Sequence, residues 1–573
     1  MIKRSQHRNW RRARLAAVMS AAVLGCGAVT ATASDYQTVT DARLAAAASD
    51  PGWLMYRRDY ASTGYAPFDQ INAGNVDKLK VAWDMKYPLT QGFEAAPVVN
   101  GNVMFVTTPM DHILALDATT GKKIWSYEFP IDKKALKTVC CDVVNRGVAL
   151  YGDSVYMETL DNHVVAFDAK TGKIKWQKQL FAPGVGYFMT SAPLAVKGKI
   201  IVGTGGGEYG ARGFITALDA KTGKIAWQVH TTAAPGEPGG DTWPKGAYKT
   251  GGGNPWITGT YDTATDTLFW GVGNPGPWLA TLRPGANLYT DSVLALDPAN
   301  GKMKWYYQWT PNDTWDYDGS NETVMADITY EGKPYKALVH ADRNGYFYAV
   351  DRTDGKLIYA KPFVHATSMV GPKDGVNQAN PDMIPTVDKG VFTCPSFLGG
   401  KNWWPISINP ELHMAYIPTL NACMDIKGTE PVAYKAGLAF LDVSFEVKHD
   451  PTNANWGGVQ AVDLNTGERV WRHETALPWN DGTLATAGNI VVSGSTDGYV
   501  HAFDAKTGKV LWKSPQLSSG IIGVPTTFKV GDKQYIAIWA GWGGASPIWG
   551  GQMANDPAVK AIPKGGHLYV FSL

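Results

Sequence analysis

ALDAKTGKIAW, at residues 217–227, decides the fold, because close variants of it occur seven times along the 573-residue chain. Each copy has an apolar residue before an Asp, a Gly four residues after that Asp, and an aromatic residue four positions further on. An apolar strand that ends at the Asp, a Gly turn and a return strand carrying the aromatic ring together predict a β-hairpin. The copies span residues 115–125, 166–176, 217–227, 295–305, 349–359, 461–471 and 502–512.

The spacing of these hairpins indicates the architecture. Most successive motif Asp residues are 41 to 54 residues apart, and a strand-rich repeat of about 40–50 residues is typical of propeller blades. One longer interval contains residues 404–418, which we interpret as an eroded eighth copy. The recurring tryptophans are expected to wedge between neighbouring sheets and therefore belong to the scaffold. The sequence thus predicts an all-β, eight-bladed β-propeller with tryptophan-docking repeats.

Two further features complete the predicted ring. Residues 567–573 are expected to pair with a strand from the stretch after Trp53, which closes the ring and leaves no exposed sheet edge. The intervals from Asp219 to Asp297 and from Asp351 to Asp463 are longer than a blade needs. We expect their extra residues to form loops, and long loops on a rigid ring are common places for binding sites.

The N-terminal residues differ from the rest of the chain. A basic start, an apolar stretch over residues 15–29 and small residues up to Ala33 predict a secretory signal peptide at residues 1–33. Residues 34–573 would then form a single domain in the periplasm, without an integral membrane span. The alternative is an uncleaved membrane anchor, but the apolar stretch is short for a span of about 20 residues. A formal net charge of +2 gives no reason to expect a nucleic-acid partner.

Four cysteines remain after removal of the signal peptide: Cys140, Cys141, Cys394 and Cys423. An even number of cysteines in an exported chain predicts disulfides. A bond between the neighbours Cys140 and Cys141 would form a small rigid ring, and two free or separately paired thiols are the alternative. The sequence contains no Cys-x-x-Cys-His motif and therefore no c-type haem site of its own. Electrons from any redox reaction must leave to another molecule.

Several oxygen-bearing residues are not explained by the repeat. Glu208 follows a run of glycines, Asn274 lies in a Gly-Asn-Pro turn, and Asp316 and Asp318 are two residues apart. If these four side chains converge, they form an all-oxygen site suited to a hard cation. The alternative is that they are ordinary solvated side chains in loops, and that Asp316 only caps a turn.

The motifs around these residues resemble those of the PQQ-dependent quinoprotein alcohol dehydrogenases, the family of methanol and ethanol dehydrogenases, where PQQ is pyrroloquinoline quinone. The similarity covers the mature chain, with blade repeats and site motifs in the same order. The motifs are CCDVVNRG (residues 140–147), GGGEYGARG (205–213), GVGNPGPW (271–278) and WDYDG (315–319). The resemblance implies a Cys140–Cys141 disulfide beside the cofactor and a second disulfide between Cys394 and Cys423.

The resemblance also implies a set of cofactor and metal contacts. Trp256 would form an aromatic floor beneath PQQ, opposite the Cys140–Cys141 ring. One metal ion, a lanthanide or Ca²⁺, would be held by Glu208, Asn274, Asp316 and Asp318. The PQQ-binding residues would be Glu94, Cys140, Cys141, Arg146, Thr190, Gly206, Gly207, Trp256, Arg343, Asn402, Trp479 and Trp542.

The implied chemistry is alcohol oxidation. Asp316 would accept the hydroxyl proton while hydride passes to the quinone, and Arg343 would stabilise the negative charge that develops on it. Asp318 resembles the second aspartate found in the lanthanide-dependent branch of the family. An additional carboxylate favours a trivalent ion over a divalent one. The expected electron acceptor is a separate cytochrome c.

Two other functions remain open at this point. A PQQ-dependent sugar or polyol dehydrogenase could use the same site with a wider mouth. A non-enzymatic propeller of the cell envelope would share the hairpins but would have no need of the cysteine pair or the acidic residues. The substrate, whether an alcohol, a polyol or a sugar, and the physiological metal are not determined by the sequence.

Overall fold

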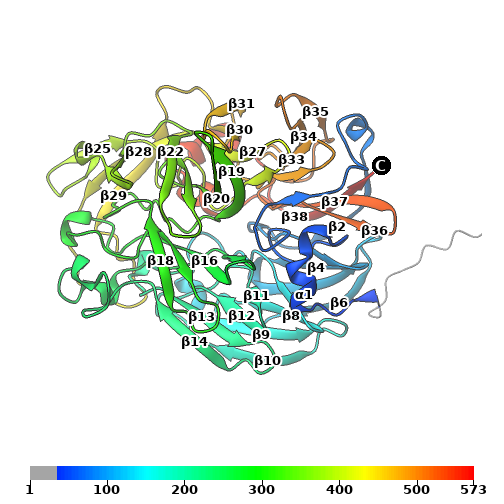
Figure 1. Ribbon diagram of the computed structural model, residues 1–573, viewed down its shortest axis with the longest axis horizontal. Coiled ribbons are helices and arrows are strands. Elements are labelled where there is room, and N and C mark those ends of the chain that lie inside the picture. Colours follow the sequence, from blue (N-terminus) through cyan, green and yellow to red (C-terminus); the bar gives the residue numbers. More distant parts are fainter. Residues whose placement is uncertain (1–34) are drawn as a thin grey trace, which may run out of the picture.

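The computed structural model describes residues 35–573, and the predicted signal peptide at residues 1–33 lies outside them. Strands dominate this part of the chain (Figure 1), so the predicted all-β class is confirmed. The α-helices are short, and none of the described residues forms a helix long and apolar enough to cross a membrane. They are α1 (Asp41–Ala45), α2 (Ala545–Trp549), α3 (Gly551–Asn555) and α4 (Pro557–Lys560).

Among residues 35–573, eight sheets of four or five strands follow one another around the molecule (Figure 1). The first four in chain order are β3 (Val98–Asn100), β4 (Val103–Thr108), β5 (His112–Asp117) and β6 (Lys123–Glu128); β7 (Ala149–Tyr151), β8 (Ser154–Glu158), β9 (His163–Asp168) and β10 (Ile174–Gln179); β11 (Leu194–Val196), β12 (Lys199–Val202), β13 (Phe214–Asp219) and β14 (Ile225–His230); and β15 (Thr260–Asp262), β16 (Thr267–Val272), β17 (Ser292–Leu296) and β18 (Met303–Gln308).

The remaining four sheets include the two that contain strands from the N-terminal part of the chain. They are β19 (Val324–Tyr330), β20 (Lys333–Ala341), β21 (Tyr346–Asp351) and β22 (Leu357–Pro362); β26 (Ser407–Asn409), β27 (Met414–Leu420), β30 (Gly457–Asp463) and β31 (Arg469–Thr475); β1 (Tyr65–Ala66) with β32 (Leu484–Thr486), β33 (Ile490–Gly494), β34 (Val500–Asp504) and β35 (Val510–Lys513); and β2 (Lys80–Tyr87) with β38 (Gly566–Ser572), β37 (Lys533–Ala540) and β36 (Thr526–Val530).

Each copy of the repeat motif forms the predicted hairpin, and its aromatic residue contacts the hairpin of the next sheet. The Trp125 indole at the start of this series donates a hydrogen bond to the Ala169 carbonyl at 2.9 Å, and a Cβ added to Gly172 would lie 2.6 Å from the indole ring. Corresponding bonds join Trp83 to Ala118, Trp176 to Ala220, Trp227 to Pro298, Tyr359 to Leu464, and Trp471 to Ala505. The motif therefore encodes both a hairpin and the contact between successive sheets.

The two ends of the chain meet in one sheet, as predicted. Strand β38 pairs antiparallel with β2, and Lys80 lies opposite Ser572. Trp83 of β2 bonds to the neighbouring hairpin in the same way as the tryptophans of the repeat. Strand β2 precedes the first copy of the motif and has no hairpin partner next to it in the sequence. The C-terminal strand β38 takes that place.

The interpretation of residues 404–418 as an eroded eighth repeat is wrong. Strands β26 and β27 pair with each other, and β27 also pairs with β30 of the copy at residues 461–471. They are the first two strands of that sheet, and the eighth sheet is the one that joins β2 to β38. Two inserted segments, one between β22 and β26 and one between β27 and β30, lengthen the interval between successive copies of the motif, so this long interval holds no additional repeat.

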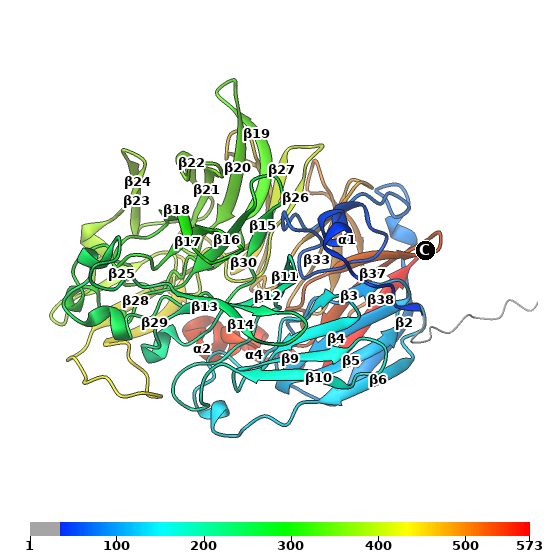
Figure 2. The same cartoon turned by 60° about the horizontal axis from the view of Figure 1, so that its bottom comes forward.

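These inserted segments are not simple loops. They form a three-stranded sheet from β25 (Gly390–Thr393), which precedes β26, and from β28 (Ala422–Gly428) and β29 (Val443–His449), which follow β27; a separate hairpin consists of β23 (Met369–Lys373) and β24 (Val376–Ala379). The predicted Cys394–Cys423 disulfide is present and joins the end of β25 to β28. Figure 2 shows α2 and α4 on the same side of the molecule as β29. The expectation that these residues form only loops is therefore wrong.

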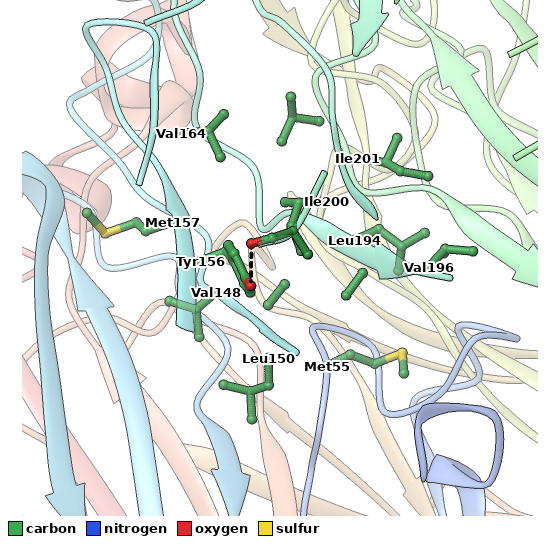
Figure 3. Packing of buried hydrophobic residues seen from close by; sticks show 14 of the residues in the cluster. Met55, Val148, Leu150, Tyr156, Met157, Val164, Leu194, Val196, Ile200 and Ile201 are labelled. Carbon is green, nitrogen blue, oxygen red and sulfur yellow. Dashed lines mark hydrogen bonds between the residues drawn. The ribbon is translucent and has the colours of Figure 1, made fainter. Parts of the chain in front are cut away.

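Apolar side chains fill the space between successive sheets. Figure 3 shows Tyr156 of β8 beside Ile200 of β12, with Leu194 of β11 and Ile201 of β12 on one side of this pair and Met157 of β8 on the other. All five are less than 5% exposed. Full burial of such a side chain contributes about 1.5–3 kcal/mol, so these layers hold neighbouring sheets rigidly in place.

The contact between the motif glycine and the preceding tryptophan can be tested with a matched pair of variants. Gly172 and Gly152 both have positive φ angles, of 69° and 58°, but nothing lies within 4 Å of a Cβ added to Gly152. Gly152→Ala should cost only the backbone strain of about 1–2 kcal/mol. Gly172→Ala should cost about 1–3 kcal/mol more, because the methyl group overlaps the Trp125 ring. Urea unfolding measures both, and equal losses of stability would contradict this packing.

Candidate active site

A cavity lies among the loops that connect neighbouring strands and successive sheets. Fourteen of the residues predicted from the sequence line it, and all fourteen lie outside the strands. The structure thus brings together Glu94, Cys140, Cys141, Arg146, Thr190, Gly206, Gly207, Glu208, Trp256, Asn274, Asp316, Asp318, Arg343 and Asn402.

One wall of the cavity is the bonded pair Cys140–Cys141, as the resemblance implies. Cys141 and the next residue, Asp142, both have left-handed backbone conformations, with φ of 69° and 84°. The Asp142 carboxylate accepts hydrogen bonds from the amides of Gly92 at 2.8 Å and Gly544 at 3.2 Å. The disulfide ring is therefore fixed to two distant parts of the chain.

A second wall carries a buried guanidinium. Arg146 forms an ion pair with Glu94 at 2.8 Å and donates to the Thr190 hydroxyl at 2.7 Å. Its guanidinium also lies over the rings of Trp256 and Trp403, at 5.0 and 4.6 Å from their centroids. Burial raises the pKa of Glu94, the positive charge of Arg146 offsets part of this rise, and the resulting pKa is about 7. The Arg146 Nε atom has no hydrogen-bond partner, which leaves a buried donor for a ligand.

A third side of the cavity carries the acidic residues. Glu208 lies in the short helix η6 (Gly207–Tyr209), and Asp316 and Asp318 adopt left-handed conformations with φ of 62° and 55°. A Cβ added to Gly207 would lie only 2.5 Å from the Asn274 side-chain oxygen, so the glycine permits this approach. These four donors, Glu208, Asn274, Asp316 and Asp318, are all oxygen donors and fit a hard cation.

Hydrogen bonds hold the two aspartates in place. Arg343 contacts Asp316 at 3.3 Å and Asp318 at 3.0 Å. Asp318 also accepts from the Asn274 amide at 3.0 Å and from the Trp256 indole N–H at 2.7 Å. One oxygen of Asp316, Oδ1, has no partner. Each aspartate therefore has a fixed orientation, and Asp316 keeps a free oxygen in the cavity.

The acidic group carries more negative charge than its neighbours balance. Burial raises the pKa of Asp316 well above its usual value, and Asp318 and Glu208 raise it further, while Arg343 lowers it. Burial and the charge of Asp318 raise the pKa of Glu208 to about 7. Among the described residues, Arg343 is the side-chain cation that ion-pairs with this group. Two buried carboxylates and the partly exposed carboxylate of Glu208, beside one guanidinium, fit a cation of high charge.

The rest of the lining is apolar and was not predicted from the sequence. The additional side chains are those of Val144, Phe188, Phe397, Leu398, Trp403 and Ala545. Apolar residues in a chain with many strands resemble ordinary core residues, so their composition carries no signal. Their position in the sequence could have indicated them, because Phe397, Leu398 and Trp403 lie within six residues of the predicted site residue Asn402.

Two predicted residues lie elsewhere. Trp479 is fully buried, donates to the Ser493 hydroxyl at 2.9 Å and has its ring 5.2 Å from that of His501. Trp542 packs in a cluster with Val559 and Ile562. Neither is among the residues that line the cavity.

Comparison with known proteins places this cavity in a family context. A protein-family model described as "PQQ: Glucose/ethanol/alcohol dehydrogenase, beta-propeller domain" matches residues 53–362 and 376–536. A quinoprotein alcohol dehydrogenase from Pseudomonas putida is 41% identical, over 89% of this chain and 89% of its own length. A lanthanide-dependent methanol dehydrogenase from Methylacidiphilum fumariolicum is 37% identical, over 91% of this chain and 93% of its own length.

The fold is likewise shared with a solved structure. A europium-containing methanol dehydrogenase superposes with a TM-score of 0.88 at 36% identity, and the match covers 93% of this chain and 100% of that one. The predicted resemblance to the PQQ-dependent enzymes is confirmed by these matches, and the fold contains a β-propeller domain.

The buried carboxylate of Asp111 holds the segment next to Arg146 in place, and this carboxylate can be titrated. Asn145 donates to the buried Asp111 carboxylate at 2.9 Å, and the Leu160 amide donates to its other oxygen at 2.7 Å. Burial raises the pKa of Asp111 to about 7. The folded protein thus holds a proton that the unfolded chain releases, so the contribution of Asp111 to stability is complete below its unfolded pKa and is lost as the pH rises towards 7.

The variant Asp111→Asn tests this support. In the metal-free protein, the wild type should lose up to about 1.4 kcal/mol of stability per pH unit through this group as the pH rises from 5 to 7. Asp111→Asn should remove that component, because Asn does not titrate. Urea unfolding at several pH values measures both slopes. Parallel pH profiles for the two proteins would show that Asp111 is ionised throughout the range.

Proposed function

The chain belongs to the family of PQQ-dependent quinoprotein alcohol dehydrogenases, and on that premise we propose that it oxidises alcohols to aldehydes in the periplasm and passes the electrons to an external cytochrome c. It is a PQQ-dependent oxidoreductase by membership of this family. The observation that carries the proposal is the convergence of fourteen residues, predicted from separate motifs, on one cavity.

The proposed scaffold is a single domain over residues 34–573, built as a closed eight-bladed propeller with tryptophan docking. Its support is the series of eight sheets of four or five strands among the described residues, the pairing of β2 with β38, and the indole-to-carbonyl bonds between successive hairpins. A closed ring leaves no free sheet edge and holds the loops in fixed positions.

The cavity fits PQQ, which is flat and carries three carboxylates. Trp256 would lie under the ring system, and the Cys140–Cys141 ring would cover it. Arg146 and Thr190 offer donors for carboxylates, and Gly206, Gly207, Glu94 and Asn402 lie on the same rim. The partnerless Nε donor of Arg146 is a direct reason to expect an anionic ligand here.

The group of acidic residues fits one metal ion. Glu208, Asn274, Asp316 and Asp318 would hold it through oxygen atoms. A third carboxylate favours a trivalent ion over a divalent one, because each added negative charge attracts it more strongly. We therefore propose a lanthanide as the metal that supports the reaction best, with Ca²⁺ as the alternative.

The protein's own residues supply the proton chemistry. When bound, PQQ supplies a two-electron acceptor, and the metal ion supplies a Lewis acid that polarises it. The free Oδ1 atom of Asp316 can accept the proton of a substrate hydroxyl, while Arg343 orients the other oxygen. Burial raises the pKa of Asp316, whereas the positive charge of Arg343 lowers that pKa and so favours the ionised form that accepts a proton. The same positive charge stabilises negative charge that develops nearby.

The lining distinguishes between substrate classes. Outside the polar groups assigned to the cofactor and the metal, the cavity offers Val144, Phe188, Phe397, Leu398 and Ala545. A sugar or polyol would leave several hydroxyls unpaired against this surface, at a cost of about 1–3 kcal/mol for each buried group. An alcohol with an apolar chain or ring needs only one polar contact. The apolar lining therefore favours an alcohol over the sugar or polyol alternative.

The cofactor and metal requirement is the first test. Dye-linked oxidation of ethanol by the metal-free full chain should need PQQ and should be faster with La³⁺ than with Ca²⁺. Asp318→Ala should lower the La³⁺-supported activity about tenfold or more and so abolish the preference for La³⁺ over Ca²⁺. The reason is that the negative charge of Asp318 attracts a trivalent ion more strongly than a divalent one. Activity with Ca²⁺ but none with La³⁺ would overturn the lanthanide assignment. No PQQ binding and no activity with any substrate would leave a non-enzymatic scaffold.

The apolar lining gives a second test. With PQQ and La³⁺ present, kcat/KM for 1-butanol and benzyl alcohol should exceed that for glycerol and glucose by at least about a hundredfold, since two or more unpaired hydroxyls oppose binding. Leu398→Ser should narrow this difference. A preference for glycerol or glucose in the wild type would favour the sugar or polyol alternative.

A further inference from the structure

We propose that Trp256 is a positioning residue for the metal site, in addition to forming the floor of the cavity. Its indole N–H donates to Asp318 Oδ2 at 2.7 Å, and Asp318 is only 2% exposed. The inference rests on the proposed function, because it requires Asp318 to be a metal ligand. Trp256 then links the floor of the cofactor site to the affinity of the metal site.

The contacts of Asp318 show why a neutral donor matters. The carboxylate receives three donors: the Asn274 amide on Oδ1 and both Trp256 and Arg343 on Oδ2. A cation bound among the acidic residues repels the Arg343 guanidinium but not an uncharged N–H group. The Trp256 bond is therefore the side-chain contact that can persist when the metal is present, and it leaves a further lone pair of Oδ2 free.

Trp256 is itself held firmly. Ser191 donates to its backbone carbonyl at 2.8 Å, and its amide donates to the carbonyl of Asn254 at 3.1 Å. The Asn254 side chain donates in turn to the Gly205 carbonyl at 3.1 Å, in the glycine run that ends at Glu208. The indole position is thus tied to the segment that carries another candidate ligand of the same ion.

Loss of the indole N–H should change Asp318 in a definite direction. Without it, the carboxylate can rotate towards Arg343 and form a stronger ion pair. A cation would then have to break that pair before binding. Removal of a partner that orients a metal ligand typically lowers metal affinity about 10- to 100-fold.

The test is a calorimetric titration of the metal-free full chain with La³⁺, without PQQ. Trp256→Phe keeps an aromatic ring but lacks the N–H, and it should weaken La³⁺ binding about 10- to 100-fold. The control is Trp403→Phe, because Trp403 lines the same cavity and contacts Arg146 but its indole does not donate to Asp318. This control should bind La³⁺ like the wild type. Thermal unfolding of each variant checks that the fold is kept.

The double variant separates this inference from the proposed function. In an Asp318→Ala background, Trp256→Phe should cause no further loss of La³⁺ affinity, because its effect acts through Asp318. If Asp318→Ala weakens La³⁺ binding and Trp256→Phe alone does not, the positioning role is overturned and the metal site stands. If Asp318→Ala has no effect, the metal assignment itself fails. An equal loss from Trp256→Phe with and without Asp318 would also overturn the inference.

Discussion

The clustering of three carboxylates, two of them buried, beside one paired guanidinium is the constraint on which the rest of the site depends. Glu208, Asp316 and Asp318 repel one another, and Arg343 offsets only part of that charge. Such a group stays together only if its backbone is held by forces that do not come from the group itself. A rigid scaffold and a bound cation are the two ways to satisfy this requirement, and the structure provides the first.

The scaffold supplies rigidity through a simple repeated device. A hairpin presents an aromatic ring, and the next hairpin presents a carbonyl and a bare glycine that accept it, as Trp125, Ala169 and Gly172 show. Repetition around the molecule and the pairing of β2 with β38 fix the loops in space. The loops are then free to carry residues that a strand would not tolerate, such as the left-handed Asp316 and Asp318.

Features encoded by local sequence patterns could be predicted from the sequence, and features that depend on three-dimensional contacts could not. The hairpins and the closing strand were predictable, because turn residues and alternating strands are local patterns. The role of β26 and β27 was misjudged, because those strands carry no motif and are separated from β30 by an inserted sheet. The polar cavity residues were found through motifs. Phe397 and Leu398 were not, because apolar residues gain meaning only from their position in three dimensions.

The most direct test of the central claim is the anomalous diffraction of a crystal of the full chain grown with PQQ and La³⁺. The account predicts one strong lanthanum peak within about 2.7 Å of oxygen atoms from Glu208, Asn274, Asp316 and Asp318. PQQ density should lie between Trp256 and the Cys140–Cys141 ring. A lanthanum peak elsewhere, with Asp318 still paired only to Arg343 and Trp256, would contradict it.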